Sequence, residues 1–252
     1  MSTHISPAVK KGKNFKVGIN VIIEDKVRFG NNVTIGNNVI IYRGASFGDN
    51  IFIMDNCVIG KQPTPPFREH AAFKTSKMPP VKFGSKIVIG TGSIFYAGSK
   101  IGDYFYSADA ILVREGCVIA KHVSIGKKAI VEHHVKLGEG TKIQSFALIG
   151  EGMFVGKNVF IGPFFNGTCD KFMNRFEKFV FQPPKIKDHA RIGAHVVMMA
   201  GTTVGKDSVI GAGAIVTKDI PDYSIAIGVP AKAIKKLPVS HQFKKLKLAV
   251  HG

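Results

Sequence analysis

The sequence lacks the long apolar runs of a membrane protein. No stretch of about 18 or more consecutive apolar residues occurs, although 45% of the 252 residues are hydrophobic, and a membrane-spanning helix needs about 20 such residues. The N-terminal stretch MSTHISPAVKKGKNF also lacks the apolar segment of a secretory signal. We therefore expect no membrane span, a cytoplasmic location and a hydrophobic core.

Cysteine is scarce, and its spacing excludes a disulfide framework. The chain has three cysteines, an odd number, and no CxxC pair, which fits a reducing compartment. Cys57 and Cys117 fall on core positions of the repeat described below, so we expect both to be buried and inert. Neither CxxC nor HxxxH spacing is present, so we expect no metal site.

Acidic residues and arginine are few. The chain has 35 basic and 17 acidic residues, for a net charge of +18, and only six of the basic residues are arginine. Such a surplus attracts anions in general. Readers of bases and phosphates favour the bidentate guanidinium of arginine, and no aromatic-plus-basic motif of a nucleic-acid module occurs. Phosphorylated small molecules are therefore favoured over nucleic acid as partners.

What the sequence does have is a six-residue repeat. Large apolar residues recur at every sixth position, with a one-residue shift of register late in the chain, and Ser107 is the one exception among 28 hexads. The series contains Val17, Ile23, Phe29, Ile35, Ile41, Phe47, Ile53 and Ile59; then Phe83 to Ile161 in the same register; then Ile186, Ile192, Met198, Val204, Ile210 and Val216.

Each hexad predicts a short strand followed by a corner. A smaller apolar residue lies two positions before each large one, as Val33 precedes Ile35, and residues two apart on a strand face the same side. Glycine often follows the large residue, as at Gly18 and Gly36, where we expect it to permit a sharp corner. A six-residue period has no helical stripe. The pattern therefore predicts an all-β, parallel β-helix solenoid.

Two segments without the repeat interrupt the solenoid. Residues 61–82 contain five prolines, and residues 163–185 are rich in phenylalanine. We expect both to be loops, either at a binding face or at a contact between subunits. The solenoid domain is expected to span residues 1–236, and residues 237–252 to form a short basic tail, either helical or frayed.

The segment GAGAIVTKDIPDYSIAIGVPAKAIKK, residues 211–236, closely resembles the ending of the hexapeptide-repeat acyltransferases. The resemblance implies a left-handed β-helix with three hexads, about 18 residues, per coil, so that 28 hexads make about nine coils. It also implies a groove for acyl-CoA. Its phosphates would lie near Lys218, Lys232 and Lys235, and Ala200, Gly201, Ala212 and Gly213 would leave room for the pantetheine arm. The alternative is that these small residues only shape the coil.

Two adjacent histidines interrupt the repeat in IVEHHVKLG, residues 130–138. With about 18 residues per coil, His133 lies in a column between Glu115 and Glu151, and a carboxylate beside an imidazole orients the ring and raises its basicity. His134 points outward between Gly116 and Gly152, which predicts open space for an acceptor. The alternative is two solvated surface histidines.

Residues 131–163 and the proline-bearing loop after VIG at 58–60 resemble the nucleotide-sugar N-acetyltransferases that acylate dTDP-linked 3-amino-3,6-dideoxyhexoses. The resemblance implies acetyl-CoA as donor and a cytoplasmic homotrimer with active sites between subunits, which serves lipopolysaccharide or S-layer glycan synthesis. It places His133 at the sugar, either as a base or as a group that only orients the acceptor. His134 and Glu151 are the expected acceptor contacts.

The chain departs from this family in the second loop. It reads Thr168-Cys169-Asp170 where such proteins have asparagine in place of Cys169, so the loop that meets the sugar, including Asp170, is expected to face a different hydroxyl pattern. A nucleophilic Cys169 is disfavoured, because a covalent acyl-cysteine is not typical of the family. Further candidates for contact with the pyrophosphate and the base are Arg114, Tyr96 and Arg68.

Two alternatives stay open at this point. Within the same class, the acceptor is a hydroxyl group or another small amine, such as a diaminopimelate precursor. Outside it, the chain is a non-catalytic hexapeptide-repeat scaffold, which the GVPAKAIK ending at residues 228–235 disfavours.

Overall fold

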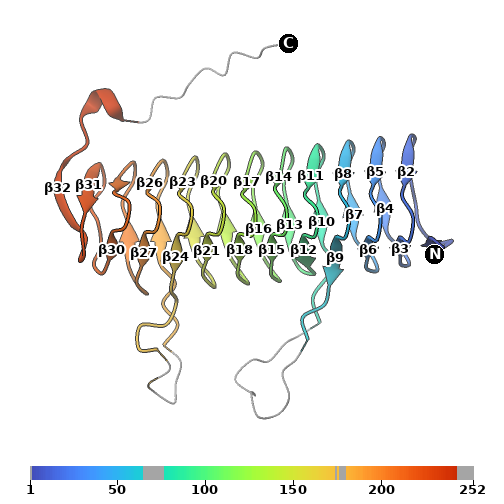
Figure 1. Cartoon of the computed structure of the whole chain (residues 1–252), viewed down its shortest axis with the longest axis horizontal. Helices are drawn as coiled ribbons and strands as arrows, with labels where there is room; N and C mark the ends of the chain where they lie inside the picture. The colour runs from blue at the N-terminus through green and yellow to red at the C-terminus, as the bar shows by residue number, and fades with distance from the viewer. Residues whose placement is uncertain (1, 65–76, 174, 176–179, 243–252) are drawn as a thin grey trace.

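The chain winds into a parallel β-helix whose coils are stacked in a single row, with β2 near one end and β32 at the other (Figure 1). The computed structural model describes residues 2–64, 77–173, 175 and 180–242. The coils form three long sheets, here called A, B and C, and each coil contributes one short strand to each sheet in turn. The all-β class and the solenoid are thereby confirmed.

Sheet A has eleven strands, and all their pairings are parallel: β1 His4–Ile5, β3 Ile22–Ile23, β6 Ile40–Ile41, β9 Val58–Lys61, β12 Ile94–Tyr96, β15 Leu112–Val113, β18 Ile130–Val131, β21 Leu148–Ile149, β24 Asn166–Gly167, β27 Val197–Met198 and β30 Ile215–Val216. Sheet B has nine: β4 Arg28–Phe29, β7 Ser46–Phe47, β10 Lys82–Phe83, β13 Lys100–Ile101, β16 Val118–Ile119, β19 Lys136–Leu137, β22 Phe154–Val155, β25 Lys185–Ile186 and β28 Thr203–Val204.

Sheet C has twelve: β2 Phe15–Val17, β5 Val33–Ile35, β8 Ile51–Ile53, β11 Ile87–Ile89, β14 Tyr106–Ser107, β17 Ser124–Ile125, β20 Lys142–Ile143, β23 Phe160–Ile161, β26 Arg191–Ile192, β29 Val209–Ile210, β31 Ser224–Ile227 and β32 Lys232–Lys236. The last pair, β31 and β32, is antiparallel and ends the sheet. Only one turn of 3-10 helix, Val239–His241, follows within the described part of the tail.

Each coil before the shorter last one takes 18 residues where no insertion intervenes, as the pairing of Ile22 with Ile40 and of Ile40 with Val58 shows. The sheets contain 11, 9 and 12 strands, so the solenoid has more turns than the nine counted from hexads. The additional strands lie at the ends, where β1 precedes the first hexad at Val17, and β31 follows the last at Val216. The left-handed sense of winding stays a prediction.

The inward positions of the hexads form one continuous core. In the N-terminal half, phenylalanines from successive coils stack on one another, with ring centroids 5.0 Å apart for Phe29 and Phe47 and 4.9 Å apart for Phe47 and Phe83. Ser107, the exception in the repeat, is also buried, and its hydroxyl oxygen accepts a hydrogen bond from the Gly90 N–H at 3.1 Å. The buried hydroxyl of Ser107 therefore has the hydrogen-bond partner that a buried polar group requires.

Apart from Gly60, whose φ is +84°, the glycines after the large residues serve close packing rather than a special backbone angle. A Cβ added at Gly18 would lie only 2.7 Å from the carbonyl oxygen of Gly36 in the next coil. Positive φ angles occur instead two residues later in the corner, as at Asn20 and Asn38, with φ of 55° and 54°. Asparagine tolerates this left-handed region better than most residues. These glycines do lie at the corners, but the prediction that they are needed there for a sharp turn of the backbone was wrong.

Side chains at the corners tie each coil to the next. Asp49 Oδ1 accepts a hydrogen bond from the Asn31 N–H at 2.6 Å, and Asp103 Oδ1 accepts one from the Ser85 N–H at 2.8 Å. These carboxylates satisfy corner N–H groups that the sheet ladders leave unpaired. The corners therefore reinforce the same register as the core.

Both insertions leave the solenoid at the same edge. We call the turn that follows a sheet A strand and precedes a sheet B strand the A–B corner. The first insertion lies between β9 and β10, the second between β24 and β25, and the described ends of both leave the row on one side (Figure 1). The second begins later than predicted, because β24 still pairs with β21 and β27.

The outward faces of sheets A and B differ in chemistry. Sheet A presents an uncharged aliphatic row between Ile22 and Ile215, interrupted only by Asn166. Sheet B presents basic residues with no acidic residue among its outward positions. The outward residues of sheet A are Ile22, Ile40, Val58, Ile94, Leu112, Ile130, Leu148, Asn166, Val197 and Ile215; those of sheet B include Arg28, Lys82, Lys100, Lys136 and Lys185.

Removing one ring from the stack should destabilise the whole solenoid. Phe47→Ala is expected to lower the free energy of unfolding by about 3–5 kcal/mol, because Phe47 is only 5% exposed and packs between two rings. Denaturant titration followed by circular dichroism measures this. Phe52→Ala is the matched control, because Phe52 is 45% exposed on the adjacent sheet; equal losses for both variants would contradict the inference.

Candidate active site at the A–B corner

The A–B corner aligns several predicted site residues in one column. The 18-residue pairing of β15 with β18 and of β18 with β21 places His133 between Glu115 and Glu151. Beyond the second insertion, the pairings of β24 with β27 and of β27 with β30 carry the column onward. The column contains Ala97, Glu115, His133, Glu151, Cys169, Ala200 and Lys218.

Both ring nitrogens of His133 face carboxylates. Nε2 lies 2.7 Å from Glu151 Oε1, and Nδ1 lies 3.4 Å from Glu132 Oε2. The Nδ1 contact is an ion pair only, since this buried nitrogen makes no well-aligned hydrogen bond with any described residue. The predicted partner Glu151 is therefore correct, whereas the second carboxylate is the neighbouring Glu132 instead of Glu115.

Glu115 pairs with arginine instead. Arg114 donates hydrogen bonds from Nε and Nη2 to the two oxygens of Glu115, at 2.9 and 3.0 Å, and its Nη1 lies 3.7 Å from Glu132. The guanidinium also lies over the ring of Tyr96, at 5.2 Å from the centroid. Arg114 thus joins Tyr96, Glu115 and Glu132 into one network beside His133.

The charges of this cluster shift the pKa values of its groups toward their ionised forms. The contact with Glu132, and then the charges of Glu151 and Glu115, raise the pKa of His133 although burial opposes the shift. The interaction with His133 holds the pKa of Glu132 below its usual range. Burial, the largest single effect, would raise the pKa of Glu115, but its hydrogen bonds with Arg114 and with the backbone, together with the charges of Arg114 and His133, lower the pKa overall. Three carboxylates thus surround one imidazole and one guanidinium.

His134 is exposed, in keeping with the predicted outward direction, but both of the glycines beside it in its column are covered. A Cβ added at Gly116 would lie 2.5 Å from His134 Nδ1, so the imidazole covers that glycine. On the other side, a Cβ at Gly152 would lie 2.6 Å from Phe181 Cζ. The expected cavity was wrong, because the sequence register could not show that Phe181 of the second insertion folds back onto this corner.

The second insertion begins in the same column. Cys169 is partly buried, and burial together with the charge of Glu151 raises the pKa of its thiol, which disfavours the thiolate that a nucleophile needs. The Asp170 carboxylate accepts a hydrogen bond from the Phe172 N–H at 2.8 Å, so it stabilises the loop itself. Cys57 and Cys117 are buried as predicted, with pKa values raised to about 11 and about 12. Arg68 lies outside the described residues.

The residues predicted to bind coenzyme A occupy three places. Ala200, Gly201 and Lys218 lie at the A–B corner, above His133 in the coils that follow. Ala212 and Gly213 lie at the other edge of sheet A, before β30. Lys232 and Lys235 are exposed on β32, at the end of sheet C. Only the first set shares an edge with His133.

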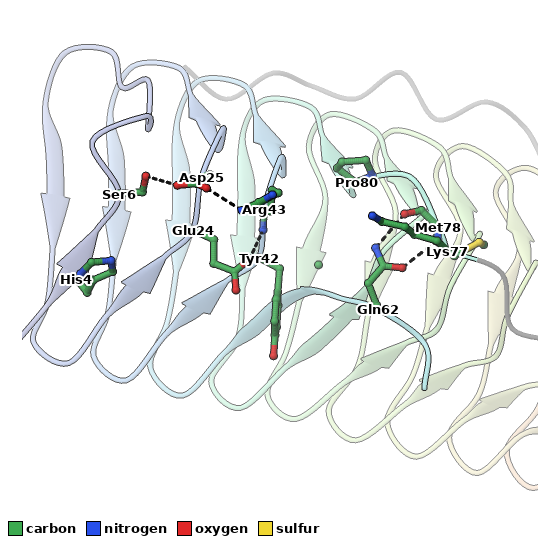
Figure 2. A pocket seen from close by; sticks show the side chains of 11 residues that line it. His4, Ser6, Glu24, Asp25, Tyr42, Arg43, Gln62, Lys77, Met78 and Pro80 are labelled. Atoms are coloured by element: carbon green, nitrogen blue, oxygen red, sulfur yellow. Dashed lines mark hydrogen bonds and ion pairs between the residues drawn. The ribbon is translucent and has the colours of Figure 1, made fainter. Parts of the chain in front are cut away.

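A pocket that the sequence did not indicate lies on the same edge, toward the N-terminus. It has a volume of about 570 Å³. Figure 2 shows Glu24, Tyr42 and Arg43 along one side, and Gln62, Lys77 and Met78 of the first insertion along the other. Asp25 accepts hydrogen bonds from Ser6 at 2.5 Å and from Arg43 at 2.8 Å. These residues are far apart in sequence, so only the coiling brings them together.

No three His, Cys, Asp or Glu side chains among the described residues are grouped to hold a metal ion. No helix in the described part of the chain is both long and apolar enough to cross a membrane.

Comparison with known proteins supports the repeat. Residues 116–151 and 183–218 match the family model described as bacterial transferase hexapeptide (six repeats). These two segments therefore carry hexapeptide repeats of the bacterial transferase type, and the first contains both histidines of the A–B corner.

Similar proteins cover only part of this chain. A Schizosaccharomyces pombe protein named as an acetyltransferase is 53% identical over 55 residues, 22% of this chain and 27% of its own length. The galactoside O-acetyltransferase of Escherichia coli is 51% identical over 55 residues, with the same shares. The chain thus spans about a quarter of these relatives. A crystal structure of LpxA, a UDP-N-acetylglucosamine acyltransferase from Bacteroides fragilis, is 20% identical, covers 93% of this chain and 73% of its own, and has a TM-score of 0.44.

Neutralising Glu132 should lower the pKa of His133, because the contact with its carboxylate is the largest cause of the raised value. We expect the imidazole titration of Glu132→Gln, followed by NMR, to shift toward lower pH. Since a raised pKa stabilises the fold below the unfolded value of about 6.5 and this stabilisation is lost as the pH rises through the folded value, the variant should lose stability at low pH. Glu139→Gln, which removes an exposed partner of Lys121, should leave the titration unchanged; an unshifted curve in Glu132→Gln would refute the assignment.

Proposed function

We propose that the protein is an acetyl-CoA-dependent N-acetyltransferase acting on the amino group of a nucleotide-linked, specifically dTDP-linked, amino-deoxy sugar. The observation that carries this proposal is the A–B column, in which His133 and Lys218 lie four coils apart on one edge. Coils spaced by about 4.8 Å make that separation about 19 Å. An extended donor with a reactive thioester at one end and phosphates at the other fits such an arrangement.

The partial matches to acetyltransferases support the class of reaction. The amine nitrogen of the acceptor attacks the thioester carbonyl carbon, the C–S bond breaks, and coenzyme A leaves as a thiolate. The proton of the amine passes to the His133–Glu151 pair and then to the thiolate. Because both nitrogens of His133 face carboxylates, Glu151 and His133 act together, and Arg114 holds the adjoining carboxylates in place.

The N-terminal pocket supports an acceptor that is longer than a simple amine. It lies on the same edge as His133, and the first insertion borders it. A nucleotide held there would extend its sugar along the edge toward His133, past Met78, whose Cε lies where it would contact a Cβ added at Gly98 or Gly116. Tyr96 and Arg114 lie between the pocket and His133 and would contact the diphosphate. The product would serve cell-surface glycan synthesis, and we place the enzyme in the cytoplasm.

The aliphatic face of sheet A supports a homotrimer. Ten outward positions from Ile22 to Ile215 carry no charge, and contiguous apolar surfaces of this kind usually mark contacts between proteins. Three copies with sheet A turned toward a common axis would bury this face and close the assembly. The A–B corner of one copy would then lie beside the opposite edge of the next, so the active site would lie between subunits.

An O-acetyltransferase of the same fold is the second candidate, because one of the similar proteins is a galactoside O-acetyltransferase. The same His133–Glu151 pair would then accept the proton of a hydroxyl group.

The deciding assay measures release of the coenzyme A thiol from acetyl-CoA with a panel of dTDP-linked amino sugars. We expect release with at least one amino sugar and none with its hydroxyl counterpart. His133→Ala and Glu151→Gln should each lower kcat/KM well over tenfold, because either change breaks the 2.7 Å contact at Nε2.

His122→Ala is the control for that assay, because His122 lies at a different corner, stacked on Tyr104 at 4.5 Å. It should leave kcat/KM unchanged. Thiol release with the hydroxyl acceptor alone would favour the O-acetyltransferase. If the protein neither releases thiol nor binds coenzyme A, both enzyme functions are excluded and a non-catalytic scaffold is the reading that stands.

Placing a charge on the sheet A face should dissociate the trimer. Leu112 lies in the middle of the aliphatic row, so Leu112→Glu would bury three carboxylates near the axis, which is unfavourable without partners. Sedimentation analysis is expected to show trimer for the wild type and monomer for the variant. Val118→Glu, on the exposed face of sheet B, should remain trimeric; a monomeric wild type would overturn the proposed assembly.

A further inference from the structure

An exposed stack of rings runs along the edge of sheet A opposite to His133. We call the turn that follows a sheet C strand and precedes a sheet A strand the C–A corner. There the rings of Phe146 and Phe164 lie 4.9 Å apart and 2° from parallel, and those of Phe164 and His195 lie 4.7 Å apart and 11° from parallel. All three residues are exposed at the surface. Their spacing is that of the coils, one ring per turn.

The stack ends where the next coil has glycine. The pairing of Val197 with Ile215 places Gly213 directly after His195 in this column. Gly213 has a φ of +71°, like the left-handed φ of 57° at His195, and a Cβ added to it would have no atom within 4 Å. Within the part of the chain that the structure describes, no ring therefore lies on the second face of the His195 ring, although each of the two preceding rings has another ring on that face.

The final turn does not cover this position. Ile210 pairs with Ala226, and the Ile215 N–H donates to the Gly228 carbonyl. Four residues separate Ile210 from Ile215, whereas Ile227 alone separates Ala226 from Gly228. The last turn therefore crosses the C–A corner by a shorter path and leaves the space above Gly213 open. Ile227 and Val229 border this path, and they are 47% and 67% exposed.

We propose that the open position above His195 is a subsite for a planar nucleobase, and that its occupant is the adenine of coenzyme A. This inference rests on the proposed function for the choice of adenine, but not for the stacking itself. A base placed over Gly213 would become the fourth ring of the stack at the spacing of the other three. Stacking of bases on aromatic side chains stabilises nucleotide binding, and the exposed apolar side chains of Ile227 and Val229 suit the edge of such a ring.

The position of the subsite along the row of coils favours coenzyme A, the acyl donor, over the nucleotide-linked acceptor as its ligand. Gly213 and Lys218 flank β30 and so lie in the same coil, on opposite edges of sheet A. In the proposed trimer, Lys218 of one subunit and the Gly213 position of the next would face the same cleft at the same height, where one nucleotide would meet both. The acceptor pocket near Tyr42 lies toward the other end of the row.

The test uses binding rather than turnover. Isothermal calorimetry on the full chain would measure coenzyme A, adenosine 3′,5′-bisphosphate, dTDP and phosphopantetheine, which lacks the base. His195→Ala removes the ring beneath the base, and Gly213→Phe fills the subsite with a ring of the protein, in a backbone conformation that Phe164 already adopts. Each should weaken coenzyme A about tenfold, the order expected for loss of one stacked base, and leave phosphopantetheine unchanged.

Matched controls separate the subsite from general damage. Gly92 lies in the same corner column, far from β30, has a φ of +69° and has equally open space, so Gly92→Phe should leave the affinity for coenzyme A unchanged. His122→Ala removes a stacked surface histidine at another corner and should likewise have no effect.

Unchanged affinity for coenzyme A in both His195→Ala and Gly213→Phe would overturn the inference, even if thiol release succeeds. If no acceptor releases thiol but adenosine bisphosphate binds in a manner that depends on His195, the subsite stands and the proposed reaction fails. Dependence on His195 for dTDP alone would also overturn the assignment, since the base would then belong to the acceptor. A wild type that binds none of these nucleotides would exclude the subsite altogether.

Discussion

The stacking of coil on coil at a fixed interval of 18 residues is the constraint on which the rest of the molecule depends. Nearly every short strand buries one large side chain and pairs in parallel with the coils on both sides, as Ile41 does between Ile23 and Ile59. A strand of two or three residues is not stable alone, so neighbouring coils supply nearly all of its stabilisation. A change of register in one coil would displace every inward side chain after it.

This interval also builds the candidate site. Residues 18 apart become neighbours about 4.8 Å apart, so Glu151 reaches the imidazole of His133 from the adjacent coil. Glu132 and Arg114 complete the charge network from the same corner. The chain has a net charge of +18, but at this corner three partly buried carboxylates surround one histidine. Their negative charge keeps the imidazole oriented and raises its pKa.

The two insertions are the places where the repeat departs from its rule, and both depart at the edge that contains this network. Their described ends turn back onto the solenoid: Met78 lies against Gly98, and Phe181 lies against Gly152. The insertions therefore shape the surface on both sides of His133. Prolines and phenylalanines mark the insertions in the sequence, but their composition does not show which part of the solenoid they contact, because such contacts depend on how the chain returns.

The solenoid, its strands and its inward residues could be predicted from the amino-acid sequence, because a period of six leaves one way to bury the apolar side chains. The contact between Glu151 and His133 could be predicted as well, since stacking at a constant interval converts sequence distance into spatial distance. The contact of Glu132, rather than Glu115, with the imidazole became evident in the folded chain, because the rotamers within one corner select among the neighbouring side chains. The folded chain also places Phe181 over Gly152, assembles the pocket near Tyr42, and leaves the ring stack open above His195. Each of these depends on insertions or chain ends, where the repeat no longer fixes the path of the backbone.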